Sequence, residues 1–196
     1  IKKLKKVLLH RPGKELLNLT PDTLSELLFD DIPYLPVAQK EHDQFASILR
    51  ENGVEVVYLE DLMTEVLMCN PGIKEKFLKQ FIYEAGIKTP KYKNLVYEYL
   101  DSIKDPKELV LKTMEGIQIR ELDREKREIE KSLVDLVSEE SKFLAKPMPN
   151  LYFTRDPFAS IGNGVSLNKM YSVTRNRETI YAEYIFEYHP EFKGQL

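Results

Sequence analysis

Two short apolar stretches constrain the fold most, because two helical patterns separate them along the chain. Residues 5–9 and residues 54–59 are rich in valine and leucine, which predicts two buried strands. The Thr-Pro-Asp sequence from Thr20 is a typical helix start, and residues 37–52 carry apolar side chains at helical spacing up to Gly53. The order strand, helix, helix, strand predicts an α/β unit in which the two strands are neighbours.

The middle of the chain differs in its sequence pattern, with long helical patterns and few β-branched runs. Between residues 91 and 146 there are 25 charged residues in 56, whereas residues 147–196 carry only 10 in 50. This shift places a boundary near Pro147. We therefore expect a first α/β part over residues 1–61, an inserted helical bundle over 62–146 and a return to the α/β part over 147–196. The helices expected in the insert lie at residues 71–84, 90–102, 106–114 and 123–138.

Charge and hydropathy exclude several classes of function. The formal net charge is −3, so the sequence has no basic field to attract nucleic acid or an anionic membrane. No apolar stretch approaches the length of a transmembrane helix, and the apolar part of the N-terminus is too short for a signal sequence. We expect a cytoplasmic protein with neither a membrane nor a nucleic-acid partner.

The side chains that could ligate a metal or act as nucleophiles are scattered. His10, His42 and His189 lack the i+3 or i+4 partners of a metal site, and His42 is expected to pack on its helix. Cys69, the single cysteine, cannot close an internal disulfide. It follows an apolar helical stretch and has no histidine beside it, which predicts a buried, unreactive thiol. No metal site is predicted.

The densest candidate for a functional site is the segment over residues 147–158, Pro-Met-Pro-Asn-Leu-Tyr-Phe-Thr-Arg-Asp-Pro-Phe. We expect an apolar strand over residues 151–154 that runs into Arg155 and Asp156. A partly desolvated carboxylate at Asp156 needs a positive partner or several donors, and a planar guanidinium would satisfy both oxygens at once. The alternative is that Arg155 pairs with Asp156 or a neighbour and fixes a turn, although adjacent residues of a strand point to opposite faces.

A second group of polar residues follows a predicted hairpin. Strands are expected over residues 158–161 and 165–171, and the Gly-Asn-Gly between them favours a tight turn. Arg175 and Arg177 come next, and in an extended chain they would share one face, so that one of them could bind a carboxylate. The alternative is a surface arginine paired with Glu178.

Several segments together carry a resemblance to a known family. The most specific is the thirteen-residue run Pro-Met-Pro-Asn-Leu-Tyr-Phe-Thr-Arg-Asp-Pro-Phe-Ala at 147–159. The others are Gly-Asn-Gly-Val at 162–165, Arg-Asn-Arg-Glu-Thr at 175–179, and residues 7–15, 26–30 and 40–42, which agree in order and spacing. This pattern resembles arginine deiminase over essentially the whole chain, most weakly in the helical insert.

The resemblance implies a fold of the α/β class, a partial α/β-propeller built of ββαβ modules with a helical bundle inserted into it. It also implies hydrolysis of L-arginine to L-citrulline and ammonia, with no metal or organic cofactor. In that family a cysteine thiolate forms a covalent intermediate with the substrate, and a histidine and a carboxylate assist. The full-length protein is expected to be a homo-oligomer.

The same resemblance assigns roles to five residues of this chain. Asp156 is the catalytic group that holds and orients the substrate guanidinium. Arg175 and Asn150 bind the α-carboxylate, Phe153 lines the guanidinium pocket and Leu28 contributes backbone contacts. These roles agree with the separate argument that Asp156 suits a guanidinium and Arg175 a carboxylate.

The nucleophilic cysteine of the family is absent from this chain, because Cys69 does not match its context. We therefore expect an N-terminal portion of the enzyme, truncated before the remaining modules, which supplies part of the substrate pocket and is inactive alone. Two alternatives stay open. One is a related guanidine-modifying enzyme, either an amidinotransferase or a methylarginine hydrolase, and the other is a non-catalytic arginine-binding module.

Overall fold

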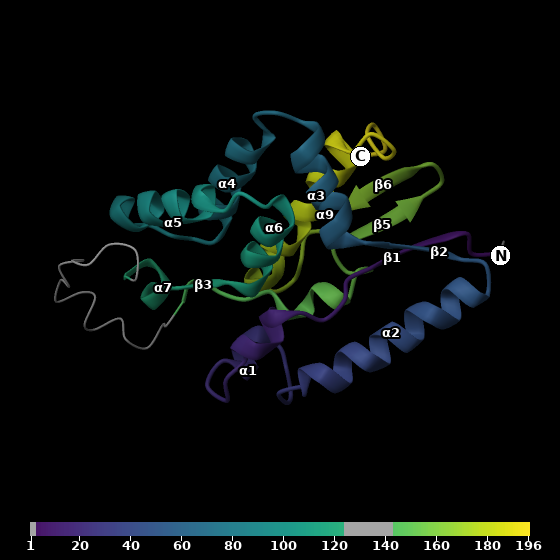
Figure 1. Cartoon of the computed structure of the whole chain (residues 1–196), viewed down its shortest axis with the longest axis horizontal. Coiled ribbons are helices and arrows are strands. Elements are labelled where there is room, and N and C mark those ends of the chain that lie inside the picture. Colours follow the sequence, from purple (N-terminus) through teal and green to yellow (C-terminus); the bar gives the residue numbers. More distant parts are fainter. Residues whose placement is uncertain (1–2, 124–142) are drawn as a thin grey trace.

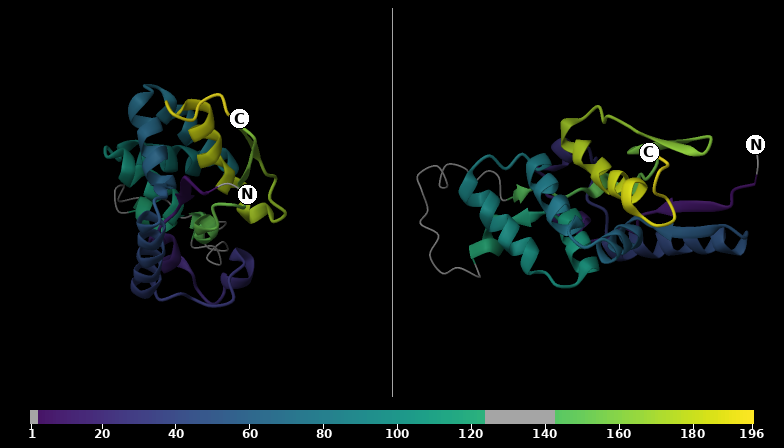
Figure 2. Two further views of the ribbon diagram at one scale, coloured as in Figure 1. Left: turned by 90° about the vertical axis from the view of Figure 1, so that its right-hand side faces the viewer. Right: turned by 90° about the horizontal axis from the view of Figure 1, so that it is seen from above.

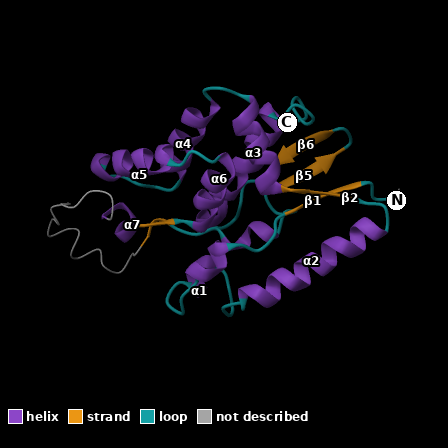
Figure 3. Ribbon diagram, in the orientation of Figure 1, coloured by secondary structure: helices purple, strands orange, loops and turns teal. Residues whose placement is uncertain are grey.

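The computed structural model describes residues 3–123 and 143–196. The molecule is elongated and rich in helices, and two of its strand pairs lie at the end that carries the N-terminus (Figures 1, 2 and 3). Within the described ranges there are three two-stranded sheets, and none of them closes on itself. The α/β class is thus confirmed in this coarse form, whereas the propeller of ββαβ modules stays a prediction. In the same ranges no helix is long and apolar enough to cross a membrane.

The first α/β unit forms as predicted. β1 (Lys6–Leu9) and β2 (Glu55–Tyr58) pair in parallel, first residue with first and last with last. Between them the long helix α2 (Leu35–Glu51) returns the chain alongside the strands (Figure 1). It ends just before Gly53, which adopts a φ of 75° and lets the chain turn back into β2.

The helix expected from Thr20 starts later than predicted. A 3-10 helix, η1 (Lys14–Asn18), comes first, and the short helix α1 (Leu24–Leu27) follows only after a turn. In this turn the Thr23 hydroxyl accepts a hydrogen bond from the Thr20 N–H and donates to the Thr20 carbonyl. The Thr-Pro-Asp signal therefore forms a turn, because a side chain satisfies the backbone before the chain becomes helical.

The helices of the middle segment pack around a core that also includes the last helix. α3 (Leu59–Cys69) contacts both α6 (Pro106–Glu115) and α9 (Thr179–Tyr188), and the ring of Phe77 packs on that of Tyr181. The division of the chain at residues 61 and 146 therefore rests on composition and stays a prediction.

The three helices expected between residues 71 and 114 are confirmed. The remaining elements of this part are α4 (Ile73–Glu84), α5 (Pro90–Ser102), β3 (Ile117–Gln118), α7 (Ile119–Asp123) and β4 (Phe143–Ala145). The helix expected at 123–138 lies, apart from its first residue, outside the described residues.

The strand expected over residues 151–154 is wrong, because η3 (Pro149–Tyr152) is a 3-10 helix. The proline at its start fixes a helical φ. The chain then keeps turning, since the Phe153 N–H donates to the Asn150 carbonyl and the Asp156 N–H donates to the Phe153 carbonyl. Asn150, Phe153 and Asp156 therefore lie on consecutive turns instead of alternating across a strand.

The hairpin that follows is confirmed. β5 (Phe158–Ile161) and β6 (Gly164–Leu167) pair antiparallel, and Gly162 in the turn has a φ of 62°. β6 ends before the predicted residue 171, because the chain turns back at Asn168, whose side-chain amide donates to the Asp156 carbonyl at 2.8 Å. The hairpin is thereby closed onto the turn that carries Asp156.

Cys69 is exposed, which corrects the prediction of a buried thiol. The buried side of α3 is formed by residues such as Leu62 and Val66. Cys69 is the last residue of this helix. Apolar spacing alone does not show that the last position of the helix is exposed.

Replacing Gly116 with alanine should lower the free energy of unfolding by about 2–3 kcal/mol. Gly116 has a φ of 89°, and a Cβ there would lie 2.8 Å from both the Ala145 carbonyl oxygen and the Pro147 nitrogen. Gly86→Ala is the matched control, because Gly86 has a φ of 71° but its Cβ would meet nothing within 4 Å. Urea denaturation measures the difference, and equal losses in the two variants would contradict the expected clash.

Candidate functional site

The five residues predicted to bind a ligand come from three segments that the fold brings together. They are Leu28 at the end of α1, Asn150, Phe153 and Asp156 in and after η3, and Arg175 in η4 (Val173–Glu178). Two contacts join these segments. Asn150 Nδ2 donates to the Leu27 carbonyl at 2.8 Å, and Arg175 Nη1 donates to Asp156 Oδ2 at 2.9 Å.

Leu28 ends α1 in a left-handed conformation, and its backbone N–H donates to the Leu24 carbonyl. Its φ of 62° is left-handed, and among the described residues no other side-chain-bearing residue has a positive φ. A left-handed leucine costs about 1 kcal/mol, yet its side chain is 54% exposed. The preceding carbonyl, that of Leu27, accepts the hydrogen bond from the buried Asn150, so α1 ends against η3. The role of Leu28 as a source of backbone contacts stays a prediction.

Arg175 is shared between two carboxylates. Its Nε donates to both oxygens of Glu178 at 3.0 Å and its Nη2 donates to Glu178 Oε2 at 2.8 Å, while Nη1 contacts Asp156. The pair with Glu178 and the pair with Asp156 therefore coexist. Burial opposes the charge of Arg175, but the hydrogen bonds to the two carboxylates outweigh burial and raise its pKa. Burial also raises the pKa of Glu178, against the effect of Arg175.

The other two arginines differ from what strand geometry predicts. Within the described residues Asp156 forms its ion pair with Arg175, not with Arg155. Arg177 does not share a face with Arg175, because η4 is a 3-10 helix rather than an extended chain. Arg177 is buried and donates to the carbonyls of residues 146 and 147. It thereby anchors η4 to the segment that leads into η3.

Aromatic rings line one side of this region, and the sequence predicts only one of them. The ring centroids of Phe153 and Tyr152 lie 3.9 Å apart, and Tyr152 lies 6.4 Å from Phe29, the residue after Leu28. Phe153 is partly exposed, so the aromatic wall is open on one side. Burial raises the pKa of Tyr152. Tyr152 belongs to the 147–159 run, which is the signal that could have identified it.

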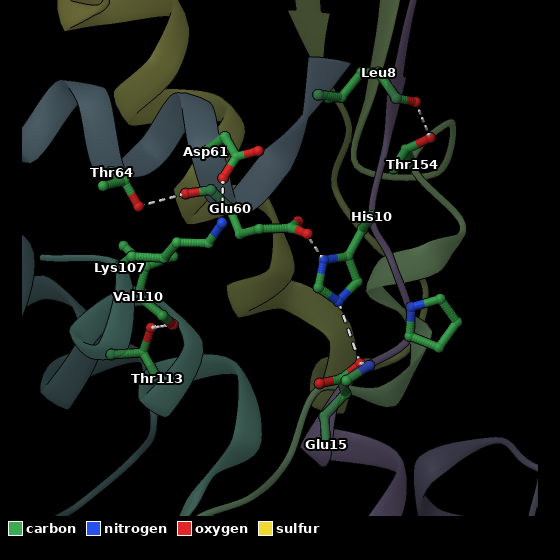
Figure 4. Close-up of polar contacts among 12 residues, drawn as sticks. Leu8, His10, Glu15, Glu60, Asp61, Thr64, Lys107, Val110, Thr113 and Thr154 are labelled. Atoms are coloured by element: carbon green, nitrogen blue, oxygen red, sulfur yellow. Dashed lines mark hydrogen bonds and ion pairs between the residues drawn. The ribbon is translucent and has the colours of Figure 1, made fainter. Parts of the chain in front are cut away.

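A buried histidine, His10, ties three elements together, and sequence reasoning missed it. His10 Nδ1 lies 2.8 Å from Glu60 Oε2, and its Nε2 lies 3.2 Å from Glu15 Oε1 (Figure 4). His10 follows β1, Glu15 lies in η1 and Glu60 lies in the first turn of α3. Burial lowers the pKa of His10, but the hydrogen bonds to the two carboxylates outweigh it and raise the pKa to about 9.

Two contacts connect this histidine cluster to the segments that carry the predicted site. The Thr154 hydroxyl donates to the Leu8 carbonyl at 2.9 Å, which attaches the end of η3 to β1 (Figure 4). Leu16 of η1 packs with Leu27 in a small buried cluster, which holds the end of α1. The two elements on either side of His10, β1 and η1, therefore contact the segment before Asp156 and the end of α1.

The site presents a carboxylate and a guanidinium side by side. Asp156 uses Oδ2 for Arg175 and its side chain is 44% exposed, so the carboxylate is accessible to a ligand. A guanidinium has five N–H donors, so Arg175 retains donors for a further anion. A ligand with a planar cation at one end and a carboxylate at the other carries a complementary group for each of these two side chains. The single cysteine of the sequence, Cys69, lies instead at the end of α3.

Comparison with known proteins agrees with this chemistry. The family model for arginine deiminase matches residues 25–196. The arginine deiminase of Treponema denticola is 63% identical over 196 residues, and those of Streptococcus agalactiae serotype Ia and Streptococcus sanguinis are 59% and 58% identical. Each match covers 100% of this chain and 47% of the relative, so the chain spans about half the length of these relatives. With its family model and these relatives in agreement, the chain belongs to the arginine deiminase family.

Proposed function

We propose that the full-length protein hydrolyses L-arginine to L-citrulline and ammonia, and that this chain supplies residues that hold both ends of the substrate. Asp156 binds the guanidinium and Arg175, with Asn150, binds the α-carboxylate. Phe153 lines the pocket and Leu28 contributes its backbone. The observation that supports these roles most strongly is the 2.9 Å ion pair between Arg175 and Asp156, because Asp156 already accepts a guanidinium there.

Substrate binding exchanges one guanidinium for another at Asp156. L-Arginine carries its guanidinium and its α-carboxylate at opposite ends, so it cannot fit between Asp156 and Arg175 while these two touch. The substrate guanidinium therefore replaces Arg175 Nη1 at Asp156, and the freed Nη1 binds the substrate carboxylate. Each charge keeps an opposite partner during this exchange, which limits its energetic cost.

The chemistry needs a thiolate, which another segment of the full-length protein supplies, since Cys69 lies outside the site. The sulfur bonds to the guanidinium carbon, the leaving nitrogen takes up a proton, and the C–N bond breaks to release ammonia. Water then adds to the same carbon and loses its protons to the histidine and carboxylate that assist the reaction in this family, the C–S bond breaks, and citrulline and the thiolate separate. Asp156 binds the guanidinium nitrogens throughout and keeps the carbon oriented toward the sulfur. On this account the chain alone is inactive.

The same proposal covers the architecture of the whole protein. Residues 1–61 and 147–196 would form the first part of an α/β-propeller, with residues 62–146 as a helical insert, in a cytoplasmic homo-oligomer that needs no cofactor. The two-stranded pairs β1–β2 and β5–β6 support this, because in a two-stranded sheet each strand has an edge that a further strand can pair with.

Product identity tests the proposed reaction. Purified full-length protein incubated with L-arginine should release citrulline and ammonia in equal amounts. A methylarginine hydrolase would release methylamine from Nω-methyl-L-arginine in preference, and an amidinotransferase would form guanidinoacetate when glycine is added. Either of these products in place of ammonia would contradict the proposal, and so would the absence of citrulline.

A further inference from the structure

Glu178, the last residue of η4, is a buried carboxylate beside the predicted site with no role in the proposed reaction. Its side chain is only 2% exposed, and it binds the edge of the Arg175 guanidinium that Nε and Nη2 form. Two parallel N–H···O contacts of this kind fix the plane of a guanidinium as well as its position. Glu178 therefore determines how Arg175 is oriented.

The two carboxylates that share Arg175 differ in how accessible they are. Asp156 is 44% exposed, whereas Glu178 is 2% exposed and lies under the Arg175 side chain. A ligand can therefore compete for the contact between Nη1 and Asp156, but it cannot reach the contact with Glu178. When the Nη1 contact opens, the Glu178 contact stays and Arg175 remains in place.

The backbone that carries Glu178 is itself anchored. Arg177, its neighbour in η4, is buried and donates to the carbonyls of residues 146 and 147. α9 then continues directly from Glu178 into the main core. Glu178 therefore keeps its position whether or not Asp156 holds Arg175.

We propose that Glu178 is a positioning residue that keeps the terminal nitrogens of Arg175 aimed at the α-carboxylate of the substrate, and that it thereby selects amino-acid guanidines over simple alkylguanidines. This inference rests on the proposed function. When the guanidinium of a substrate displaces Arg175 Nη1 from Asp156, the α-carboxylate of the same substrate can accept a hydrogen bond from Nη1 instead. Agmatine, which is arginine without that carboxylate, binds Asp156 but leaves Arg175, whose side chain is only 13% exposed, without its second partner, which is unfavourable.

The test compares L-arginine and agmatine as substrates of the full-length protein and of its Glu178→Gln variant. Glutamine keeps the size of the side chain but presents an N–H₂ group to the Arg175 donors. We expect the KM for L-arginine to rise about tenfold with kcat changed less than about threefold. Agmatine has no carboxylate for Arg175 to bind, so its kcat/KM should fall less than that of L-arginine, and the preference for L-arginine over agmatine should therefore fall several-fold.

Asp43→Asn is the matched control. Asp43 binds Arg11 through the same guanidinium edge, at 2.7 and 2.8 Å, but on an exposed surface outside the predicted site. This variant should leave both substrates unaffected. Arg175→Lys adds a second check, because lysine cannot offer that edge. In the Arg175→Lys background the Glu178→Gln change should have no further effect on the KM for L-arginine.

The outcomes separate this inference from the proposed function. If the wild-type protein makes no citrulline from L-arginine, the proposed function is wrong. If the wild-type protein does make citrulline, but Glu178→Gln leaves kcat/KM unchanged for both substrates or lowers it equally for both, Glu178 has no positioning role. Glu178→Asp, which keeps the charge, should recover part of the KM loss. If neither Glu178 variant folds, as judged by circular dichroism, Glu178 serves the fold and the inference is overturned.

Discussion

Replacing Asp156 with asparagine should lower kcat/KM for L-arginine about a thousandfold in the full-length protein. Asparagine keeps the shape of the side chain but loses the negative charge and replaces one acceptor with a donor. The substrate guanidinium, which consists only of donors, would then meet an N–H₂ group and lose its orientation toward the attacking sulfur. Initial rates of citrulline formation measure this loss.

The fold should tolerate this change. Asp156 is 44% exposed, so its ion pair with Arg175 contributes at most about 1 kcal/mol to stability. Asp61→Asn is a suitable control, because Asp61 has the same exposure and pairs with Lys107 at 2.7 Å away from the predicted site. It should keep wild-type activity. An Asp156→Asn protein with more than about a tenth of wild-type kcat/KM would show that Asp156 does not orient the substrate.

The stability of the protein should fall as the pH rises from about 6.5 to about 9, because of His10. In the folded state the pKa of His10 is raised from 6.5 to about 9. Below pH 6.5 the imidazole is charged in both the folded and the unfolded state, and the full stabilisation by Glu15 and Glu60 is present. Above that pH the unfolded state loses its proton first, so the stabilisation declines and is gone above about pH 9. A shift of this size corresponds to about 3 kcal/mol.

His10→Gln isolates this effect. It leaves two buried carboxylates facing a neutral amide, so at pH 6 it should destabilise the protein by about 3–5 kcal/mol. The difference from wild type should shrink as the pH approaches 9, in urea unfolding followed across the pH range. A difference that does not change with pH would mean that His10 is not charged in the folded protein.

His42→Gln is a control of opposite sign. Burial is the main cause that lowers the pKa of His42, which lies half-buried on α2 against Tyr58, as the sequence predicts for a packed helix residue. For such a group the folded state is penalised at acid pH. Its removal should therefore make the protein relatively more stable as the pH falls, whereas His10→Gln should make it relatively less stable.

Local signals predicted the helices well, because the residues that start and stop them act within one turn. α5 and α6 both begin at a proline, and the side chain of Asp105 caps α6 by accepting the Glu108 N–H at 2.7 Å. The glycine after α2 ends that helix as expected. These effects depend on backbone conformation at single positions, so they can be derived from the sequence.

The errors arise where neighbours far along the chain decide the outcome. The apolar run at residues 151–154 matches a strand, but Leu151 is fully buried in the helical core and η3 forms instead. Cys69 matches a buried position by spacing, but as the last residue of α3 it is exposed. A local pattern does not show which distant residues an apolar side chain packs against, or how far these residues bury it.

The site was predictable in residue type but not in arrangement. The carboxylate of Asp156 and the guanidinium of Arg175 were predicted for complementary ligands, yet a hairpin lies between them, and the sequence does not indicate that they touch. Glu178 was considered only as an alternative partner of an arginine, whereas Arg175 binds both carboxylates at once. His10 and Glu60 are fifty residues apart in sequence, and only the pairing of β1 with β2 brings them together.

A crystal structure of the full-length protein, soaked briefly with L-arginine and frozen, would show whether this chain holds L-arginine by both ends. We expect the ligand guanidinium on Asp156 and the ligand carboxylate on Arg175 and Asn150. The contact between Arg175 Nη1 and Asp156 should be open, and the contact between Arg175 and Glu178 should be retained. Density for L-arginine elsewhere, or an Arg175 that still occupies Asp156 beside a bound ligand, would contradict this expectation.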